Sequence, residues 1–260
     1  MAAGWVIAIY ELTLYFLISY KIRKYYKELQ NMNAIMYYWF TMTVLTMIWE
    51  CSFVYQYKSI NVFSQNLIEN HTHVWTNDYG IEYVLPWKTA FLFYGEYGAY
   101  ADREYMVRAN DWSRVIESSH AIFCGAFSFL VLYLKVNNKF IGRGVVVSRA
   151  GHRAAGKYYL AIGVSMGSQA MNSVLYMANY LVQMRDVNNI NYCSDAFPCH
   201  FALLSRAFMY VNVFWVVMPS YAIISSWGAG NSILKNDRLN ICGNGEDRKD
   251  GHKNLGAKLI

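Results

Sequence analysis

Charged residues are scarce in this chain. They make up 15% of its 260 residues, whereas apolar residues reach 55%. Soluble domains carry far more charge, so this composition favours a protein embedded in a lipid bilayer. The chain also lacks a P-loop, because the Gly-rich piece Gly142 to Gly144 is not followed by the Lys-Ser/Thr pair that cradles phosphate. His71 and His73 are too few to indicate a metal site. We therefore expect no metal and no cofactor.

Long apolar runs dominate what is present. Runs of roughly 18 or more apolar residues are typical of membrane helices, and four runs reach this length while one at the N-terminus is borderline. The sequence therefore predicts an all-α integral membrane protein built as a five-transmembrane-helix bundle. The predicted spans are Gly4 to Tyr20, Ala34 to Tyr57, Trp112 to Leu134, Tyr158 to Met184 and Phe201 to Trp227.

The charges that remain predict an orientation. Basic residues follow the first span, return between the third and fourth spans, and recur in the tail, whereas the other two connections are neutral to acidic. The positive-inside rule then predicts a lumenal N-terminus and a cytosolic C-terminus. The net charge of +6 follows from this bias, so we expect no nucleic-acid partner. The chain divides into a membrane domain over residues 1–227 and a polar, mobile tail over residues 228–260.

Both outer connections suit a lumenal location. The first contains the glycosylation sequon Asn70-His71-Thr72, and the second contains Cys193 and Cys199, which we predict to form a disulfide in an oxidising compartment. The first span has no charged n-region and no convincing cleavage site, so we expect it to stay attached.

Two carboxylates lie near the middle of predicted spans, Glu50 in the second and Glu117 in the third. A carboxylate at this depth is costly, so it usually faces the bundle interior and has a function. Together they predict an acid/base pair that faces one cavity open to lipid. The structural alternative is that each Glu bonds to a neighbouring helix.

Three segments resemble the emopamil-binding protein family, the membrane-embedded sterol isomerases of the EXPERA superfamily. The resemblance runs from about Ala34 to Trp227. The segments are Trp49-Glu50, the stretch GEYGAYADREY at 95–105 that leads into VIESSHA at 115–121, and VNVFWVVMP at 211–219.

The resemblance implies a five-helix protein of the endoplasmic reticulum that moves a double bond by protonation, carbocation formation and deprotonation. Glu50 matches the acid-side carboxylate, and Glu117 matches the one that takes the proton back. Trp215 matches the aromatic side chain that faces the cation, which an indole face stabilises. Asn212 falls where the family also has Asn, and Asp102 matches the Asp of a structural lid; both are candidates for substrate contacts. Without the resemblance, core packing or interfacial anchoring is the preferred interpretation of Trp215.

Departures from the family pattern are as informative. Thr46 stands one turn before Glu50, where the sterol isomerases carry His, so the usual His-Glu donor pair is incomplete. His120 shares a helix face with Glu117 and is a candidate for the missing imidazole; the alternative is a hydrogen-bonded core histidine. In the fourth span, an Asp of the family falls at Ser173. Polar residues of this span are further candidates for substrate contacts: Gln169, Asn172 and Tyr176.

These departures leave the substrate open. The leading prediction is an isomerase or cyclase that acts on a sterol or terpenoid through a carbocation. An alternative is a meroterpenoid cyclase that opens an epoxide, because a carboxylic acid suffices for that step. Another is a sterol or ligand receptor without catalysis. The expected partners are a hydrophobic lipid and the bilayer, and a homodimer is left open.

Overall fold

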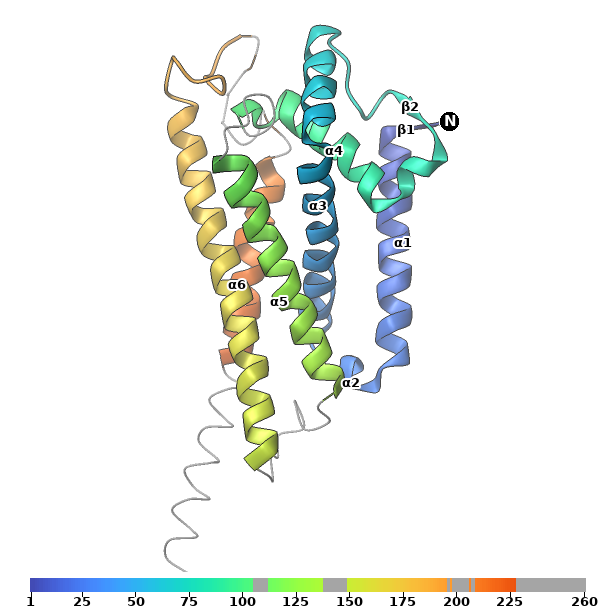
Figure 1. Cartoon of the computed structure of the whole chain (residues 1–260), viewed down its shortest axis with the longest axis vertical. Coiled ribbons are helices and arrows are strands. Elements are labelled where there is room, and N and C mark those ends of the chain that lie inside the picture. The colour runs from blue at the N-terminus through green and yellow to red at the C-terminus, as the bar shows by residue number, and fades with distance from the viewer. Residues whose placement is uncertain (105–111, 138–148, 196, 198–205, 207–208, 228–260) are drawn as a thin grey trace, which may run out of the picture.

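The computed structural model describes residues 1–104, 112–137, 149–195, 197, 206 and 209–227. These residues are mostly helical, which confirms the all-α prediction to that extent. Five long helices lie side by side along the long axis (Figure 1). They are α1 (Gly4–Tyr25), α3 (Ala34–Glu69), α5 (Ser118–Asn137), α6 (Arg149–Gln183) and a helix over residues 210–227, here called the last helix.

Two helices in the described part of the chain are long and apolar enough to cross a membrane, α1 and the segment Val115–Asn137. The other long helices carry more polar side chains, and several of these line the interior of the bundle. The bundle of five membrane spans therefore remains a prediction, while two membrane-compatible helices are observed.

Helix α1 exposes apolar side chains and buries polar ones, which is the opposite of a surface helix in a soluble protein. Its buried positions include the polar residues Glu11 and Ser19, whereas soluble helices bury their apolar stripe. Its exposed face carries large apolar side chains: Ile9, Leu14, Phe16, Leu17 and Ile18. This pattern suits a helix whose outer surface contacts lipid tails, because each polar group then needs a partner inside the protein.

Helix α3 is the longest described element. Its 36 residues rise roughly 54 Å, more than the roughly 30 Å of a bilayer core. Asn33 caps its start, since Asn33 Oδ1 accepts hydrogen bonds from the amides of Ile35 and Met36. The helix ends where His71 takes a left-handed conformation with φ of 52°. The predicted span end at Tyr57 is therefore the end of an apolar run and not of the helix.

Helix α4 (Pro86–Tyr100) lies inside the predicted outer connection and packs across α3 at one end of the bundle (Figure 1). Two glycines permit close helix contacts. A Cβ on Gly95 would lie 2.4 Å from the Phe63 ring, and one on Gly125 of α5 would lie 2.3 Å from Met47 Cβ. Side chains at these positions would push α4 and α5 away from α3.

Smaller elements occupy the two ends of the bundle. Strand β1 (Ala2–Ala3) pairs antiparallel with β2 (Asp78–Tyr79), and η1 (Ile81–Val84) precedes α4. The short α2 (Lys27–Gln30) lies at the opposite end, beside α5. Lys24 and Lys27 lie near α2, and the N-terminus lies at the opposite end of the bundle (Figure 1).

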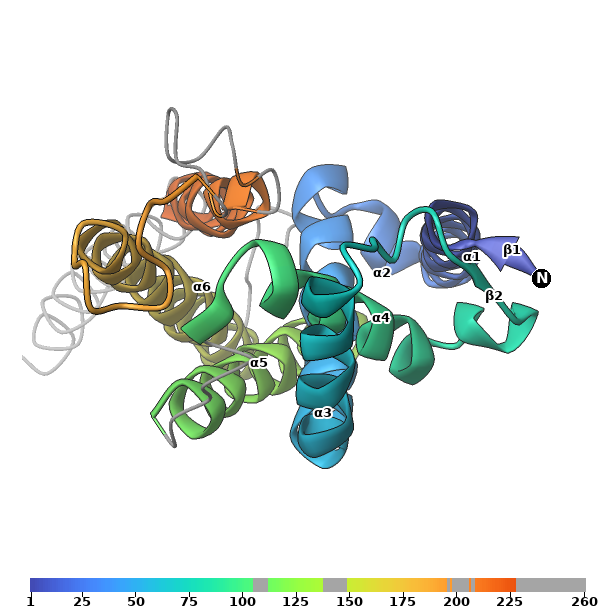
Figure 2. The same cartoon turned by 90° about the horizontal axis from the view of Figure 1, so that it is seen from above.

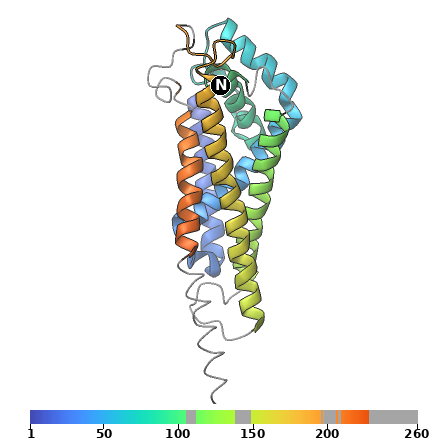
Figure 3. The same cartoon turned by 90° about the vertical axis from the view of Figure 1, so that its left-hand side faces the viewer.

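Viewed down the axis, α6 and the last helix lie opposite α1, with α3 and α5 between them (Figure 2). Figure 3 shows the last helix running alongside α6. The largest apolar cluster joins α2, α3, α5, α6 and the last helix, through buried residues such as Leu29, Phe40, Val131, Met166 and Ala222. Trp39 belongs to this core and Trp215 packs against it, and both also line the cavity described next.

Beyond the C-terminal end of α6, Cys193 belongs to a disulfide, and its predicted partner Cys199 lies outside the described residues. Arg206 is buried there, and its guanidinium donates to Tyr180 Oη at 2.5 Å, to Asn191 O at 2.8 Å and to Phe197 O at 3.3 Å. Arg206 therefore ties α6 to the connection that follows it.

Candidate active site

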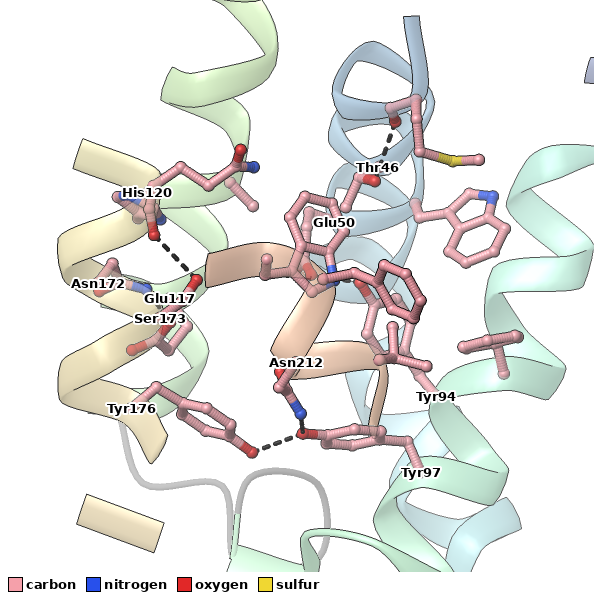
Figure 4. Close-up of a pocket in the computed structure, with 18 of the residues that line it drawn as sticks. Thr46, Glu50, Tyr94, Tyr97, Glu117, His120, Asn172, Ser173, Tyr176 and Asn212 are labelled. Atoms are coloured by element: carbon pink, nitrogen blue, oxygen red, sulfur yellow. Dashed lines mark hydrogen bonds between the residues drawn. The ribbon is translucent and has the colours of Figure 1, made fainter. Parts of the chain in front are cut away.

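A cavity of about 400 Å³ lies between α1, α3, α4, α5, α6 and the last helix (Figure 4). Most of its wall is apolar or aromatic. Leu12 on α1 and Phe214 on the last helix both line the cavity and are 43% and 61% exposed, so its mouth lies between these two helices. An apolar molecule in the surrounding medium can reach the cavity sideways, without passing through the ends of the bundle.

Both carboxylates from the predicted acid/base pair line this cavity. Glu50 comes from α3, is 7% exposed, and accepts a hydrogen bond at Oε1 from Tyr94 Oη of α4. Its Oε2 is buried and accepts no hydrogen bond from the described residues. Glu117 lies on the opposite side and accepts a hydrogen bond at Oε2 from Asn172 Nδ2 at 2.7 Å. The two carboxyl groups therefore have different neighbours, which suits two different roles.

Local backbone geometry contributes to the position of Glu117. The residues before α5 form a π-helical segment, Trp112–Glu117, and Glu117 is its last residue. A π-helical turn is wider than an α-helical turn and shifts the direction of the side chains that follow it, and such turns are frequent at functional sites. Sequence periodicity alone does not reveal this turn.

Trp215 lines the cavity and packs on Trp39 of α3, with ring centroids 5.0 Å apart. Trp39 in turn donates its indole N–H to Gln169 Oε1 at 3.1 Å. Gln169 thus supports an aromatic wall, and Trp39 is a wall residue that the sequence analysis did not single out. Two indole rings beside an apolar cavity offer a surface that stabilises positive charge.

The cavity ends in a group of polar side chains. Asn212 Nδ2 donates to Tyr97 Oη at 3.4 Å, and Tyr97 Oη lies 2.5 Å from Tyr176 Oη. Tyr176 Oη donates to Asp102 Oδ2 at 2.5 Å. Asp102 does not line the cavity but lies directly behind it, so the substrate contact predicted for Asp102 is indirect, through Tyr176.

The remaining candidates also line the cavity. Thr46 lies one turn from Glu50 and donates its hydroxyl to Met42 O of its own helix at 3.0 Å. His120 places Nε2 3.1 Å from Ser168 Oγ and 3.3 Å from Cys124 Sγ. These contacts turn the imidazole toward α6 and away from Glu50, so they give no support to His120 as a substitute for the family histidine.

Two polar residues of the cavity wall were not singled out from the sequence. Glu11 of α1 is 4% exposed, lines the cavity, and accepts a hydrogen bond from Trp49 Nε1 at 3.0 Å. Tyr94 is the hydrogen-bond donor to Glu50. Glu11 was visible as a carboxylate in an apolar run, the same signal that identified Glu50. Tyr94 gave no signal, because its role depends on the position of α4.

Comparison with known protein families, curated proteins and solved structures finds no match for this chain.

Proposed function

We propose that this chain is a membrane-embedded enzyme that isomerises or cyclises a sterol or terpenoid lipid through a carbocation. The observation that carries the proposal is the placement of Glu50 and Glu117 on separate walls of one largely apolar cavity. An alkene is a weak base, so its protonation needs a positioned acid in a site without water, and the resulting cation needs a base on another side. The resemblance to the emopamil-binding protein family supports the same assignment.

The carboxyl groups suit complementary steps. In this proposal Glu50 delivers the proton, with Tyr94 bonded to one oxygen and the other oxygen left for the substrate. One alkene carbon gains that proton, and the adjacent carbon becomes cationic. Glu117, oriented by Asn172, then removes a proton from a neighbouring carbon and the C–H electrons form the new double bond. The proton count balances, and no oxidant or cofactor is needed.

The cation requires protection from water and a compensating surface. Trp215 and Trp39 supply aromatic faces on one wall, each worth on the order of 2 kcal/mol when desolvated. The mouth between Leu12 and Phe214 supports a substrate that arrives from the bilayer. The inverted surface of α1 and the alternation of basic and acidic connections support five membrane spans with a lumenal N-terminus, and we propose the endoplasmic reticulum as the location.

A second candidate is acid-catalysed opening of a terpenoid epoxide. The contacts of Glu50 favour it, because its described hydrogen-bond donor is a tyrosine and Thr46 occupies the position of the family imidazole. An epoxide oxygen accepts a proton from a single carboxylic acid, and the carbocation that follows ends by the same loss of a proton to Glu117.

Incubation of membranes that contain the full chain with sterols, triterpenoids and prenylated epoxides tests the proposal. We expect one class to yield an isomer of unchanged mass, and an alkene substrate to gain one carbon-bound deuterium when it reacts in heavy water. Matched membranes that contain Glu50→Gln serve as the control. No conversion of any substrate class, with the folded protein present, would contradict the proposal and favour a ligand-binding role.

A further inference from the structure

Ser118, the first residue of α5, has a buried hydroxyl group that its own helix does not use. Ser118 is 1% exposed, and its Oγ takes part in no hydrogen bond among the described residues. Serines elsewhere in the long helices donate to the carbonyl oxygen of the residue four positions earlier, as Ser64, Ser173 and Ser220 do. Ser118 is the exception in this comparison, and a buried hydroxyl without a partner costs about 1–3 kcal/mol.

The backbone before Ser118 accounts for the exception. A helical serine usually bonds to the carbonyl four residues before it. For Ser118 that carbonyl lies within the π-helical segment Trp112–Glu117, whose wider turn places carbonyl groups differently from an α-helix. The Ser118 proton therefore remains free for a partner on another helix.

The packing of α5 on α3 makes Glu50 that partner. The two helices run antiparallel (Figure 1), and a Cβ on Gly125 of α5 would lie 3.0 Å from Thr43 O of α3. Seven residues make about two helical turns and return to nearly the same face. Two turns from the contact of Gly125 with Thr43, Ser118 on α5 and Glu50 on α3 therefore face each other. The side-chain hydroxyls that act on the Glu50 carboxyl group are those of Tyr94 and Ser118.

Glu50 has an oxygen that suits this hydroxyl. Tyr94 donates to Oε1, whereas Oε2 is buried and accepts no hydrogen bond from the described residues. The Ser118 hydroxyl faces the carboxyl group without forming a hydrogen bond in this arrangement. Two buried polar groups from packed helices thus face each other unbonded, and a small movement of the Ser118 side chain would join them.

The protonation state of Glu50 decides how much this bond contributes. A protonated carboxyl group is itself a donor, whereas an ionised carboxylate only accepts and has about four lone-pair sites. Hydrogen bonds to a charged group are stronger than those between neutral groups. A hydroxyl beside Oε2 therefore stabilises the ionised form more than the protonated form, and a group that stabilises a conjugate base strengthens the acid.

We propose that Ser118 is a positioning residue for the proton donor: its hydroxyl donates to Glu50 Oε2 as Glu50 gives up its proton. Tyr94 and Ser118 then bind one carboxylate oxygen each. This inference rests on the proposed function, in which Glu50 is the acid. Ser118 keeps its own proton throughout, so the proton count of the proposed reaction is unchanged.

The proposal explains how a carboxylic acid inside an apolar cavity can protonate a weak base. Removal of a proton from Glu50 leaves a negative charge with little water to solvate it, which opposes the transfer. Two hydroxyl donors from separate helices, α4 and α5, replace part of that solvation. They are held in place before the reaction, so little reorganisation is needed when the charge appears.

Infrared spectroscopy of the full-length protein in lipid nanodiscs tests the hydrogen bond without any substrate. The carboxyl band of protonated Glu50 is assigned by its loss in Glu50→Gln and followed against pH. In Ser118→Ala the ionised form loses a donor, so the band should persist to a pH about one unit or more higher than in the wild type, equivalent to at least about tenfold in proton affinity. Both proteins keep the other titratable groups that line the cavity: Glu11, Tyr94, Tyr97, Glu117, His120 and Tyr176.

Matched variants separate the hydroxyl from general packing. Ser119→Ala, at the neighbouring exposed position of α5, is the control and should leave the band unchanged. Ser118→Thr keeps a hydroxyl and should restore the wild-type pH dependence. With an alkene substrate, Ser118→Ala should lower kcat by roughly tenfold or more and change KM little, because Ser118 does not line the cavity.

The infrared result decides the proposal. An unchanged pH dependence in Ser118→Ala would overturn it, even if kcat fell, because Ser118 would then act only through packing. If Ser118→Ala does not fold, as judged by gel filtration, Ser118→Cys keeps the volume with a weaker donor and should shift the band in the same direction. A shifted band in a protein that converts no substrate would support the hydrogen bond and contradict the proposed enzyme.

Discussion

Replacing Glu117 by Gln gives the sharpest test of the acid/base assignment. Asn172 Nδ2 donates to Glu117 Oε2 at 2.7 Å, and the amide oxygen of Gln can accept the same hydrogen bond. The folded structure should therefore lose little, on the order of 1 kcal/mol. The base, however, is gone. General acid/base groups contribute roughly 100-fold or more to rate, so kcat should fall by at least about 100-fold, equivalent to about 2.7 kcal/mol of transition-state stabilisation.

Heavy-water incorporation is the assay of choice for this prediction. Product formed from an alkene substrate should carry one carbon-bound deuterium in the wild type, and its rate of formation should fall sharply in Glu117→Gln while substrate affinity changes little. The chain offers a matched control in Glu104, whose Oε2 accepts a hydrogen bond from Asn189 Nδ2 at 2.9 Å outside the cavity. Glu104→Gln removes a carboxylate with the same kind of partner and should retain activity.

The reasoning is refuted by one clear result. If Glu117→Gln and Glu50→Gln both convert the substrate at near wild-type rates, the carboxylates serve only to bind neighbouring helices. The carbocation mechanism is then wrong.

Three further predictions address the fold and the site. Asn70 should be accessible to lumenal glycosylation and the tail after Trp227 to cytosolic protease in sealed microsomes; protection of the tail would reverse the orientation. Gly125→Val should lower the free energy of unfolding by about 1–3 kcal/mol, because its Cβ would lie 2.3 Å from Met47 Cβ. The measurement is the thermal unfolding temperature in detergent, which should fall. An unchanged unfolding temperature would contradict the close packing of α5 on α3. Thr46→His should be tolerated sterically because Thr46 lines the cavity. Activity on an alkene substrate should be kept or raised. Loss of the folded protein in gel filtration would show that the cavity has no room for a larger side chain at this position.

Sequence reasoning was most successful where the physical signal is local. Apolar runs predicted the approximate extent of the long helices, since a helix that faces lipid must be apolar over its outer surface. The C-terminal end of α3 and the start of α6 were missed, because both helices extend beyond the apolar run into residues that periodicity does not distinguish from loops. The short α4 was missed for the same reason.

The carboxylates Glu50 and Glu117 were identified from their depth in apolar runs, and their common cavity agrees with the prediction that they face inward. Depth alone does not give direction around a helix. Sequence therefore offered His120 as a partner for the site, whereas packing of α5 on α6 turns its ring toward Ser168.

What the sequence by itself determined is a helical chain with membrane-compatible segments, an orientation bias and a short set of costly polar residues. These follow from composition and from the cost of polar groups in hydrocarbon, which depend on neighbours along the chain. Only the tertiary structure decided which of those groups meet. Tyr94 reaches Glu50 because α4 crosses α3, and Tyr176 of α6 reaches Asp102, which follows α4 in the chain. Such contacts join residues far apart in sequence, so they depend on helix packing and leave no local pattern.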